Sequence, residues 1–165
     1  SSDLKGTKLR PYNDGGSQEF GMRAGTENVA AIVGMAEALR LNCEKMKEHA
    51  DHLLVLERVI LDRLASSPIV YKRNGAQKHV PGNMSLSFRG ASGEMLLHRL
   101  DLMGICISTG SACDSQNTQI SHVLASMNLE KCYAEGTIRI SLGKENTIND
   151  AIIIGDSIIK ILVKG

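Results

Sequence analysis

The first long hydrophobic pattern in the chain runs from Thr26 to about Ser66. Apolar residues recur there at steps of three and four, which is the period of one helix face. They are Val29, Val33, Ala36, Leu39, Cys43, Met46, Ala50, Leu53, Ile60 and Leu64. We expect one long helix or two joined helices, with Thr26 as the candidate N-cap because its hydroxyl can accept a backbone N–H bond. Residues 1–25 hold glycines and polar residues without a period, so we expect an entry loop.

Two later segments alternate apolar with polar residues, which is the period of a half-buried strand. In residues 83–88 the alternation is between Met84, Leu86 and Phe88 and the serines that separate them. In residues 137–142 three apolar residues share one face, and Thr137, Arg139 and Ser141 share the other. Shorter strands are expected over residues 69–71 and 105–107, with turns at Asn74-Gly75 and Pro81-Gly82.

Helices are expected between and after these strands. Ser92 opens one that continues to about Asp101, and a short one covers residues 121–127. An Ile-rich helix starts at Thr147, whose spacing to Asp150 resembles a capping box with Asp in place of Glu. Strands interleaved with covering helices predict a layered α/β or α+β domain with a sheet of three or four strands.

Composition and charge narrow the function classes. With 165 residues, of which 42% are hydrophobic, the chain is long enough for one core. Its formal net charge of +1 provides no basic field for nucleic acid and no acidic tail. No apolar run reaches the length of a membrane span, and the first residues lack a signal-type apolar stretch. We therefore expect a soluble, cytoplasmic protein that has no nucleic acid or membrane as a partner.

The four cysteines differ in their surroundings. Cys113 lies among small and polar residues, where an accessible thiol can act as a nucleophile. Cys43 and Cys106 lie in apolar patterns, so we expect both to pack in the core. Cys132 lies in a short polar connection. On the residues alone, a plain surface thiol is the alternative for Cys113.

Two further sites are compatible with ligand binding, and each has a simpler alternative. The glycines of residues 15–25 and the hydroxyl of Thr26 at an expected helix start are suited to binding a phosphate. No P-loop lysine follows them. The alternative is a capped helix after a glycine-rich loop. Arg139 suits a carboxylate because its guanidinium is a planar fork of donors; the alternative is a solvated strand face. His49 and His52 lack a third ligand, so we expect no metal site.

Three segments together resemble cysteine desulfurases of the NifS/IscS type, in the class V aminotransferase family. They read GGSQEFGMRAGTENVAAIVGMAEAL at 15–39, STGSACDSQNTQISHVLASMNL at 108–129 and GTIRISLGKENTINDA at 136–151. The resemblance implies a homodimer of fold type I that depends on pyridoxal 5'-phosphate (PLP). It makes residues 1–25 the end of the large PLP-binding domain, 26–66 a long connecting helix and 67–165 the small C-terminal domain with the catalytic cysteine loop.

The resemblance also implies site residues and a reaction. Thr26 would contact the PLP phosphate of the partner subunit, Arg139 would bind the substrate carboxylate, and Cys113 would be the catalytic nucleophile. L-cysteine would become L-alanine, and its sulfur would stay on Cys113 as a persulfide. A sulfur-acceptor or iron-sulfur scaffold protein would receive it for iron-sulfur cluster or thio-cofactor biosynthesis. The long polar loop after the cysteine resembles the group of these enzymes that has a mobile catalytic loop.

The sequence departs from the family pattern in two ways. Ser17, Phe20 and Ala24 replace a Gly, an Arg and a Ser that are usual in the first motif. The lysine that binds PLP has no counterpart here, because Lys5 and Lys8 lack its sequence context. We therefore expect a fragment that is inactive alone. The alternatives are a non-catalytic sulfur-acceptor or interaction module, and a selenocysteine lyase or a cysteine lyase on the same fold.

Overall fold

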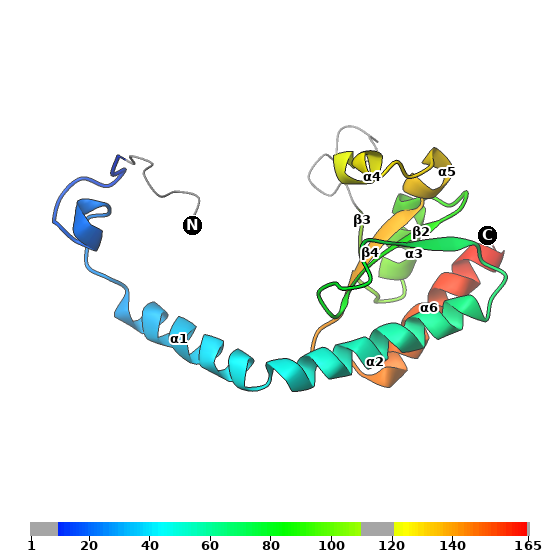
Figure 1. Ribbon diagram of the computed structural model, residues 1–165, viewed down its shortest axis with the longest axis horizontal. Coiled ribbons are helices and arrows are strands. Elements are labelled where there is room, and N and C mark those ends of the chain that lie inside the picture. Colours follow the sequence, from blue (N-terminus) through cyan, green and yellow to red (C-terminus); the bar gives the residue numbers. More distant parts are fainter. Residues whose placement is uncertain (1–9, 110–120, 165) are drawn as a thin grey trace. The chain divides into compact units, whose positions relative to one another are not determined.

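The computed structural model describes residues 10–109 and 121–164, and the chain forms two compact units. The first unit comprises Ser1–Lys45 and the second Met46–Gly165. Each unit has its own helices (Figure 1), and all the strands of the described residues belong to the second. The boundary falls at Lys45, whose backbone (φ −105°, ψ 9°) is not helical.

In residues 10–45 the first unit has an irregular segment followed by helix α1, Val29–Glu44. The 3-10 turn η2 (Glu19–Gly21) lies within this irregular segment. The helix is capped by Asn28, whose Oδ1 accepts a bond from the Ala31 N–H at 3.1 Å. The prediction that Thr26 is the N-cap is therefore wrong, because Asn28 is the residue whose side-chain oxygen reaches the first turn.

Helix α2, Met46–Ala65, starts the second unit directly after Lys45. The hydrophobic pattern allowed one long helix or two joined helices, and the structure has two joined helices. Its residues Leu56, Ile60 and Leu64 are fully buried. By contrast, no residue of α1 is buried, and the expectation that Cys43 packs in a core is wrong for the described part of the chain.

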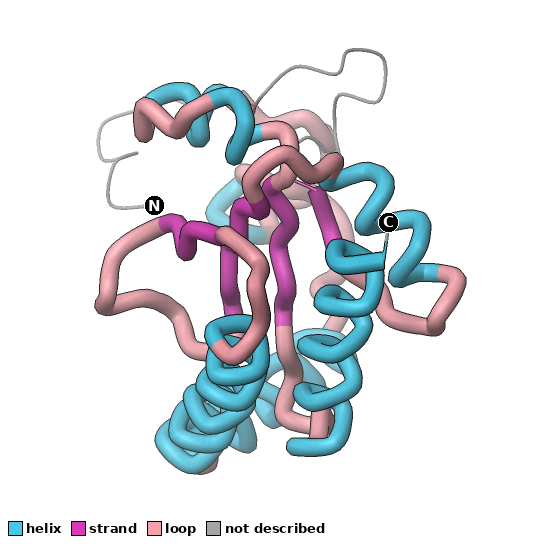
Figure 2. The backbone as a smooth tube through the Cα atoms, turned by 90° about the vertical axis from the view of Figure 1, so that its right-hand side faces the viewer, coloured by secondary structure: helices cyan, strands magenta, loops and turns pink. Residues whose placement is uncertain are grey.

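Four antiparallel strands form the sheet of the second unit, in the order β1-β2-β4-β3. They are β1 (Tyr71–Asn74), β2 (Asn83–Phe88), β3 (Ser108–Thr109) and β4 (Thr137–Ser141). The strands lie side by side in Figure 2. β2 and β4 match the two alternating segments of the sequence, and the predicted sheet of three or four strands is confirmed.

The two shorter strands are displaced from their predicted positions. β1 begins at Tyr71, where the predicted segment 69–71 ends, and β3 follows the predicted segment 105–107. Ile105 and Ile107 pack against the core without entering the sheet, and pairing with β4 starts at Ser108. Cys106 points outward between them and is exposed, so the prediction that it is a packing residue is wrong.

The remaining helices are α3 (Gly93–Asp101), α4 (His122–Ser126), α5 (Lys131–Ala134) and α6 (Ile148–Lys164). Ser92 caps α3, since its Oγ accepts a bond from the Met95 N–H at 3.3 Å. The capping box before α6 is confirmed. The Thr147 N–H donates to Asp150 Oδ2 at 2.8 Å, and the Asp150 N–H donates to Thr147 Oγ1 at 3.2 Å. Cys132, which was expected in a polar connection, lies in α5 and is half-buried.

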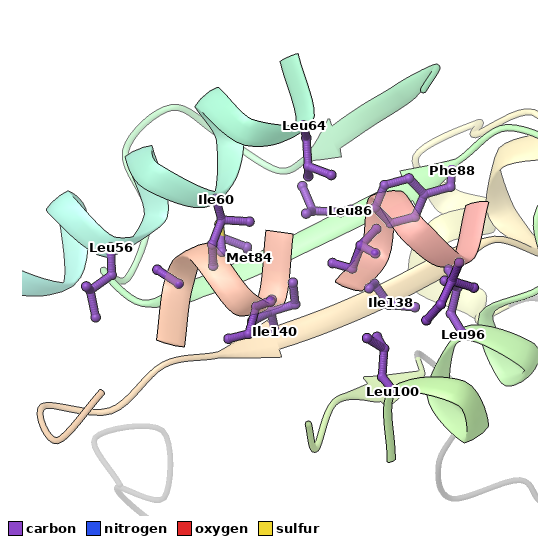
Figure 3. Close-up of a cluster of buried hydrophobic side chains, with 14 residues drawn as sticks. Leu56, Ile60, Leu64, Met84, Leu86, Phe88, Leu96, Leu100, Ile138 and Ile140 are labelled. Atoms are coloured by element: carbon purple, nitrogen blue, oxygen red, sulfur yellow. The ribbon is translucent and has the colours of Figure 1, made fainter. Parts of the chain in front are cut away.

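The core lies between one face of the sheet and the helices α2, α3 and α6 (Figure 3). The apolar residues of β2 and β4, including Met84, Leu86 and Ile138, face this layer and are fully buried. Each such side chain contributes about 1.5–3 kcal/mol through the apolar surface that it removes from water. The predicted layered α+β architecture is confirmed. The apolar face of the sheet is therefore covered by helices, and Arg139 and Ser141 of β4 are exposed on the other face.

Candidate functional site

Arg139 lies in the middle of a polar row that crosses the sheet. It is paired in register with Ser85 on β2 and with Ser108 on β3, and Ser85 is in turn paired with Asn74 on β1. Paired residues point to the same face of a sheet, so four strands contribute one polar residue each to this row. The arginine side chain is exposed. The row therefore displays one positive charge among neutral hydrogen-bonding groups.

The guanidinium of Arg139 is held by one side chain of the row. Its Nη2 donates a hydrogen bond to Ser108 Oγ at 3.4 Å. The Ser108 hydroxyl donates to the carbonyl oxygen of Thr109 at 3.1 Å, so its lone pairs remain available for the arginine. Within residues 10–109 and 121–164, Arg139 forms no ion pair with a carboxylate. Its charge is therefore available for an anionic ligand.

A second chain of hydrogen bonds fixes the sheet beside this row. Asn74 Nδ2 donates to the hydroxyl oxygens of Ser85 and Ser87, at 3.1 and 2.7 Å. The buried hydroxyls of Ser87 and Thr137 are 2.7 Å apart, and Thr137 donates to the carbonyl oxygen of Tyr133 at 3.2 Å. A network in which each hydroxyl has a partner gives these side chains one arrangement. Arg139 therefore projects from an ordered polar surface.

Lys72 on the edge strand β1 is also positively charged, but its charge is paired with a carboxylate. Its Nζ lies 2.8 Å from Glu130 Oε1 and 4.1 Å from the centre of the Tyr133 ring. The hydrogen bond from Lys72 lowers the pKa of Glu130, and the same bond raises the pKa of Lys72. Lys72 is therefore satisfied within the chain, in contrast to Arg139.

The segment before α1 contains Thr26, which precedes the cap residue Asn28 by two positions. Gly25 adopts a positive φ of 103°, and its N–H donates to Gln18 Oε1 at 3.2 Å. Arg23 Nη1 donates to the carbonyl oxygens of Gly25 and Thr26, at 3.1 and 3.4 Å. These bonds order the turn that leads into the helix. Because Asn28 is the cap, the exposed hydroxyl of Thr26 is not used to hold the helix end.

These groups fit a phosphate. The hydroxyl of Thr26 is a donor, the N-terminus of the 16-residue helix α1 carries partial positive charge, and Arg23 supplies a full positive charge. They account for the phosphate end of a cofactor such as PLP and for no other part of it.

The predicted site residues are distributed over different parts of the chain. Thr26 belongs to the first unit and Arg139 to the second, and Cys113 lies outside the described residues. No group of three or more metal-ligating side chains occurs in the described ranges. No helix in those ranges is long and apolar enough to cross a membrane. What the second unit does bring together is Arg139 and Ser108, whose side chains are hydrogen-bonded. Ser108 was missed because the sequence does not show which strands pair.

Comparison with known proteins identifies the family. The family model of aminotransferase class-V matches residues 7–152. The chain belongs to this family. Among similar family members, cysteine desulfurase IscS of Dictyoglomus turgidum is 41% identical over 150 residues, which is 88% of this chain and 37% of the relative. Cysteine desulfurase IscS of Clostridium botulinum is 40% identical over 162 residues, covering 96% of this chain and 40% of the relative.

Solved structures in the same family have the same fold. A NifS-like protein, 33% identical, superposes with a TM-score of 0.80 over 98% of this chain and 41% of its own. A NifS-like protein from Rickettsia africae, 27% identical, gives 0.78 over 94% of this chain and 41% of its own. The resemblance to NifS/IscS-type proteins is confirmed, and so is the assignment to their fold. The chain spans about two fifths of the length of these relatives.

Proposed function

We propose that this chain is the C-terminal part of a PLP-dependent cysteine desulfurase, which converts L-cysteine to L-alanine and transfers the sulfur to Cys113. The observation that carries this proposal is the identity of about 40% to IscS cysteine desulfurases over nearly the whole chain. The proposed domains are the end of the large domain over residues 1–25, the connecting helical segment over 26–66 and the small domain over 67–165.

Thr26 is proposed to bind the phosphate of PLP in a homodimer, where it would act on the cofactor of the partner subunit. The donor set of Thr26, Arg23 and the start of α1 supports this role. When bound, PLP supplies an electron sink that weakens the bonds of the substrate around its α-carbon. The lysine that holds PLP covalently would come from another part of the whole protein.

Arg139 is proposed to bind the carboxylate of L-cysteine. Its side chain is exposed on the polar sheet face and has no carboxylate partner in the described part of the chain. A guanidinium can form two parallel hydrogen bonds to a carboxylate, which fixes the orientation of the amino acid as well as its position.

Cys113 is proposed to take the sulfur. Its thiolate attacks the sulfur of the substrate, a new S–S bond forms as the substrate's C–S bond breaks, and the carbon accepts a proton. The products are L-alanine and a persulfide on Cys113, so the atoms balance without an external oxidant. Thr109 pairs with Ile138, next to Arg139, and four residue steps extend to at most about 14 Å. Covalent connection alone therefore tethers Cys113 to the strand beside the proposed carboxylate site.

The partners and location of the whole protein follow from the same proposal. L-cysteine is the substrate, and a sulfur-acceptor or iron-sulfur scaffold protein receives the persulfide sulfur. Such a transfer requires free thiols, which a reducing, cytoplasmic compartment maintains. This fits a chain whose described cysteines, Cys43, Cys106 and Cys132, are all unbridged.

The proposal is tested with Cys113→Ser in the whole protein. This variant is expected to retain PLP and L-cysteine binding, which are followed by the cofactor's absorbance, and to lose alanine formation. Cys132→Ser is the matched control and is expected to keep alanine formation at the wild-type rate. Mass spectrometry of wild type after a pulse of L-cysteine is expected to find one additional sulfur atom on the peptide that contains Cys113. Normal alanine release from Cys113→Ser would refute the assignment.

A further inference from the structure

We propose that Ser108 is a positioning residue for Arg139, whose guanidinium it holds ready for the substrate's carboxylate. This inference rests on the proposed role of Arg139 and assigns a function to Ser108, which the sequence did not indicate. Ser108 does not itself contact the substrate in this proposal. It acts by restricting the conformations of the arginine before substrate binds.

The first support is the hydrogen bond between the two side chains. Arg139 Nη2 donates to Ser108 Oγ at 3.4 Å, and the hydroxyl proton of Ser108 is directed to the carbonyl oxygen of Thr109. The serine is therefore oriented as an acceptor. A guanidinium has five N–H donors, so one bond to Ser108 leaves enough donors for a bidentate pair with a carboxylate.

The second support is the contrast between the two serines that flank Arg139. Ser85 on β2 and Ser108 on β3 occupy equivalent places in the register, one on each side of the arginine. Ser85 Oγ accepts a bond from Asn74 and forms none with Arg139. Only the side chain of Ser108 bonds to the guanidinium within the described residues. Ser85 is therefore a control for Ser108, because it also flanks Arg139 but does not bond to it.

The third support is the energetic need for such a contact. An exposed arginine has many rotamers, and ordering it on binding opposes substrate affinity. A bond that already restricts the side chain reduces this entropic loss. The effect concerns binding of the carboxylate and leaves the sulfur-transfer step unchanged. Loss of the bond should therefore raise KM and leave kcat unchanged.

The test compares Ser108→Ala with Ser85→Ala in the whole, PLP-loaded protein. Ser108→Ala is expected to raise KM for L-cysteine about threefold to tenfold, with kcat within about twofold of wild type. Ser85→Ala is expected to leave KM within about twofold. Ser108→Thr keeps the hydroxyl and is expected to restore KM. A merely structural role would move the two alanine variants alike, or would lower cofactor content.

A double-mutant cycle with Arg139→Ala separates this inference from the proposed function. If Ser108 acts through the arginine, Ser108→Ala should not lower kcat/KM further once Arg139 has been removed. An undiminished effect of Ser108→Ala in that background overturns the positioning role. So does an unchanged KM in Ser108→Ala while Arg139→Ala is impaired, and in that case the carboxylate role of Arg139 survives. If Arg139→Ala itself leaves KM unchanged, the proposed role of the arginine fails, and the inference fails with it.

Discussion

Removal of the Glu57 carboxylate should destabilise the second unit strongly, because this group is buried and has several partners. Its side chain is only 3% exposed. Oε1 accepts a bond from the Gly82 N–H at 2.6 Å, and Oε2 lies 2.8 Å from Arg73 Nη2 and 2.9 Å from His79 Nε2. One carboxylate on α2 therefore holds the connection between β1 and β2.

The size of the effect can be divided among these partners. Glu57→Ala leaves the buried N–H of Gly82 without an acceptor, which costs about 1–3 kcal/mol. The side chains of Arg73 and His79 are 32% and 20% exposed, so water can replace part of what they lose. With the lost packing of the Cγ methylene group, the sum is about 3–5 kcal/mol. Glu57→Gln keeps the shape and one acceptor for Gly82, and its cost should be about 1–2 kcal/mol.

Urea unfolding followed by far-UV circular dichroism measures both variants. With a slope of about 2 kcal/mol per molar urea, Glu57→Ala should lower the midpoint by about 1.5–2.5 M and Glu57→Gln by about 0.5–1 M. Glu145→Gln is the control, since the Glu145 side chain is 90% exposed and its contact with Lys144 is 4.0 Å long. Equal losses in the two Glu57 variants would refute the reasoning, because the bond to Gly82 would then be irrelevant.

Three further predictions concern other parts of the chain. Gly136→Ala should destabilise the sheet by about 1–3 kcal/mol, because the new Cβ would overlap the carbonyl oxygen of Phe88; Gly143→Ala has space and should be neutral in the same urea assay. The pKa of Asp150 is lowered, mainly by the hydrogen bond from the backbone at the start of α6. The contribution of ionised Asp150 to the free energy of unfolding should be complete above the usual Asp pKa of about 4 and should disappear as the pH falls through the lowered pKa. The urea midpoint of Asp150→Asn should therefore depend less on pH in the acid range than that of wild type. Thr26→Ala in the whole protein should lose PLP faster on dialysis, which absorbance would detect; unchanged retention would contradict the phosphate role.

Local signals in the sequence predicted β2, β4, α3 and the capping box. Alternation fixed the buried face of β2 and β4, and the spacing of Thr147 and Asp150 specified reciprocal bonds that need no distant partner. The cap of α1 was missed because Thr26 and Asn28 are both good cap residues, and only the backbone of the preceding turn decides between them.

Errors arose where a distant segment decides the local structure. Ile105 and Ile107 favour a strand by residue type, yet the pairing partner on β4 places the strand at Ser108. The same limit explains the candidate site. Alternation indicated the polar face that carries Arg139, but the serines beside it are 31 and 54 residues away in the chain, and their register is set by the packed sheet.

Because β3 is short, it restricts where the chain around Cys113 can change in length without moving Ser108. Because β3 contributes only two residues, a single insertion or deletion just before Ser108 would turn it to the helix-covered face and present a neighbour to Arg139. A length change after Thr109 leaves this pairing unchanged. A segment exchanged between relatives at this place should therefore be joined after Thr109, so that β3 keeps its register.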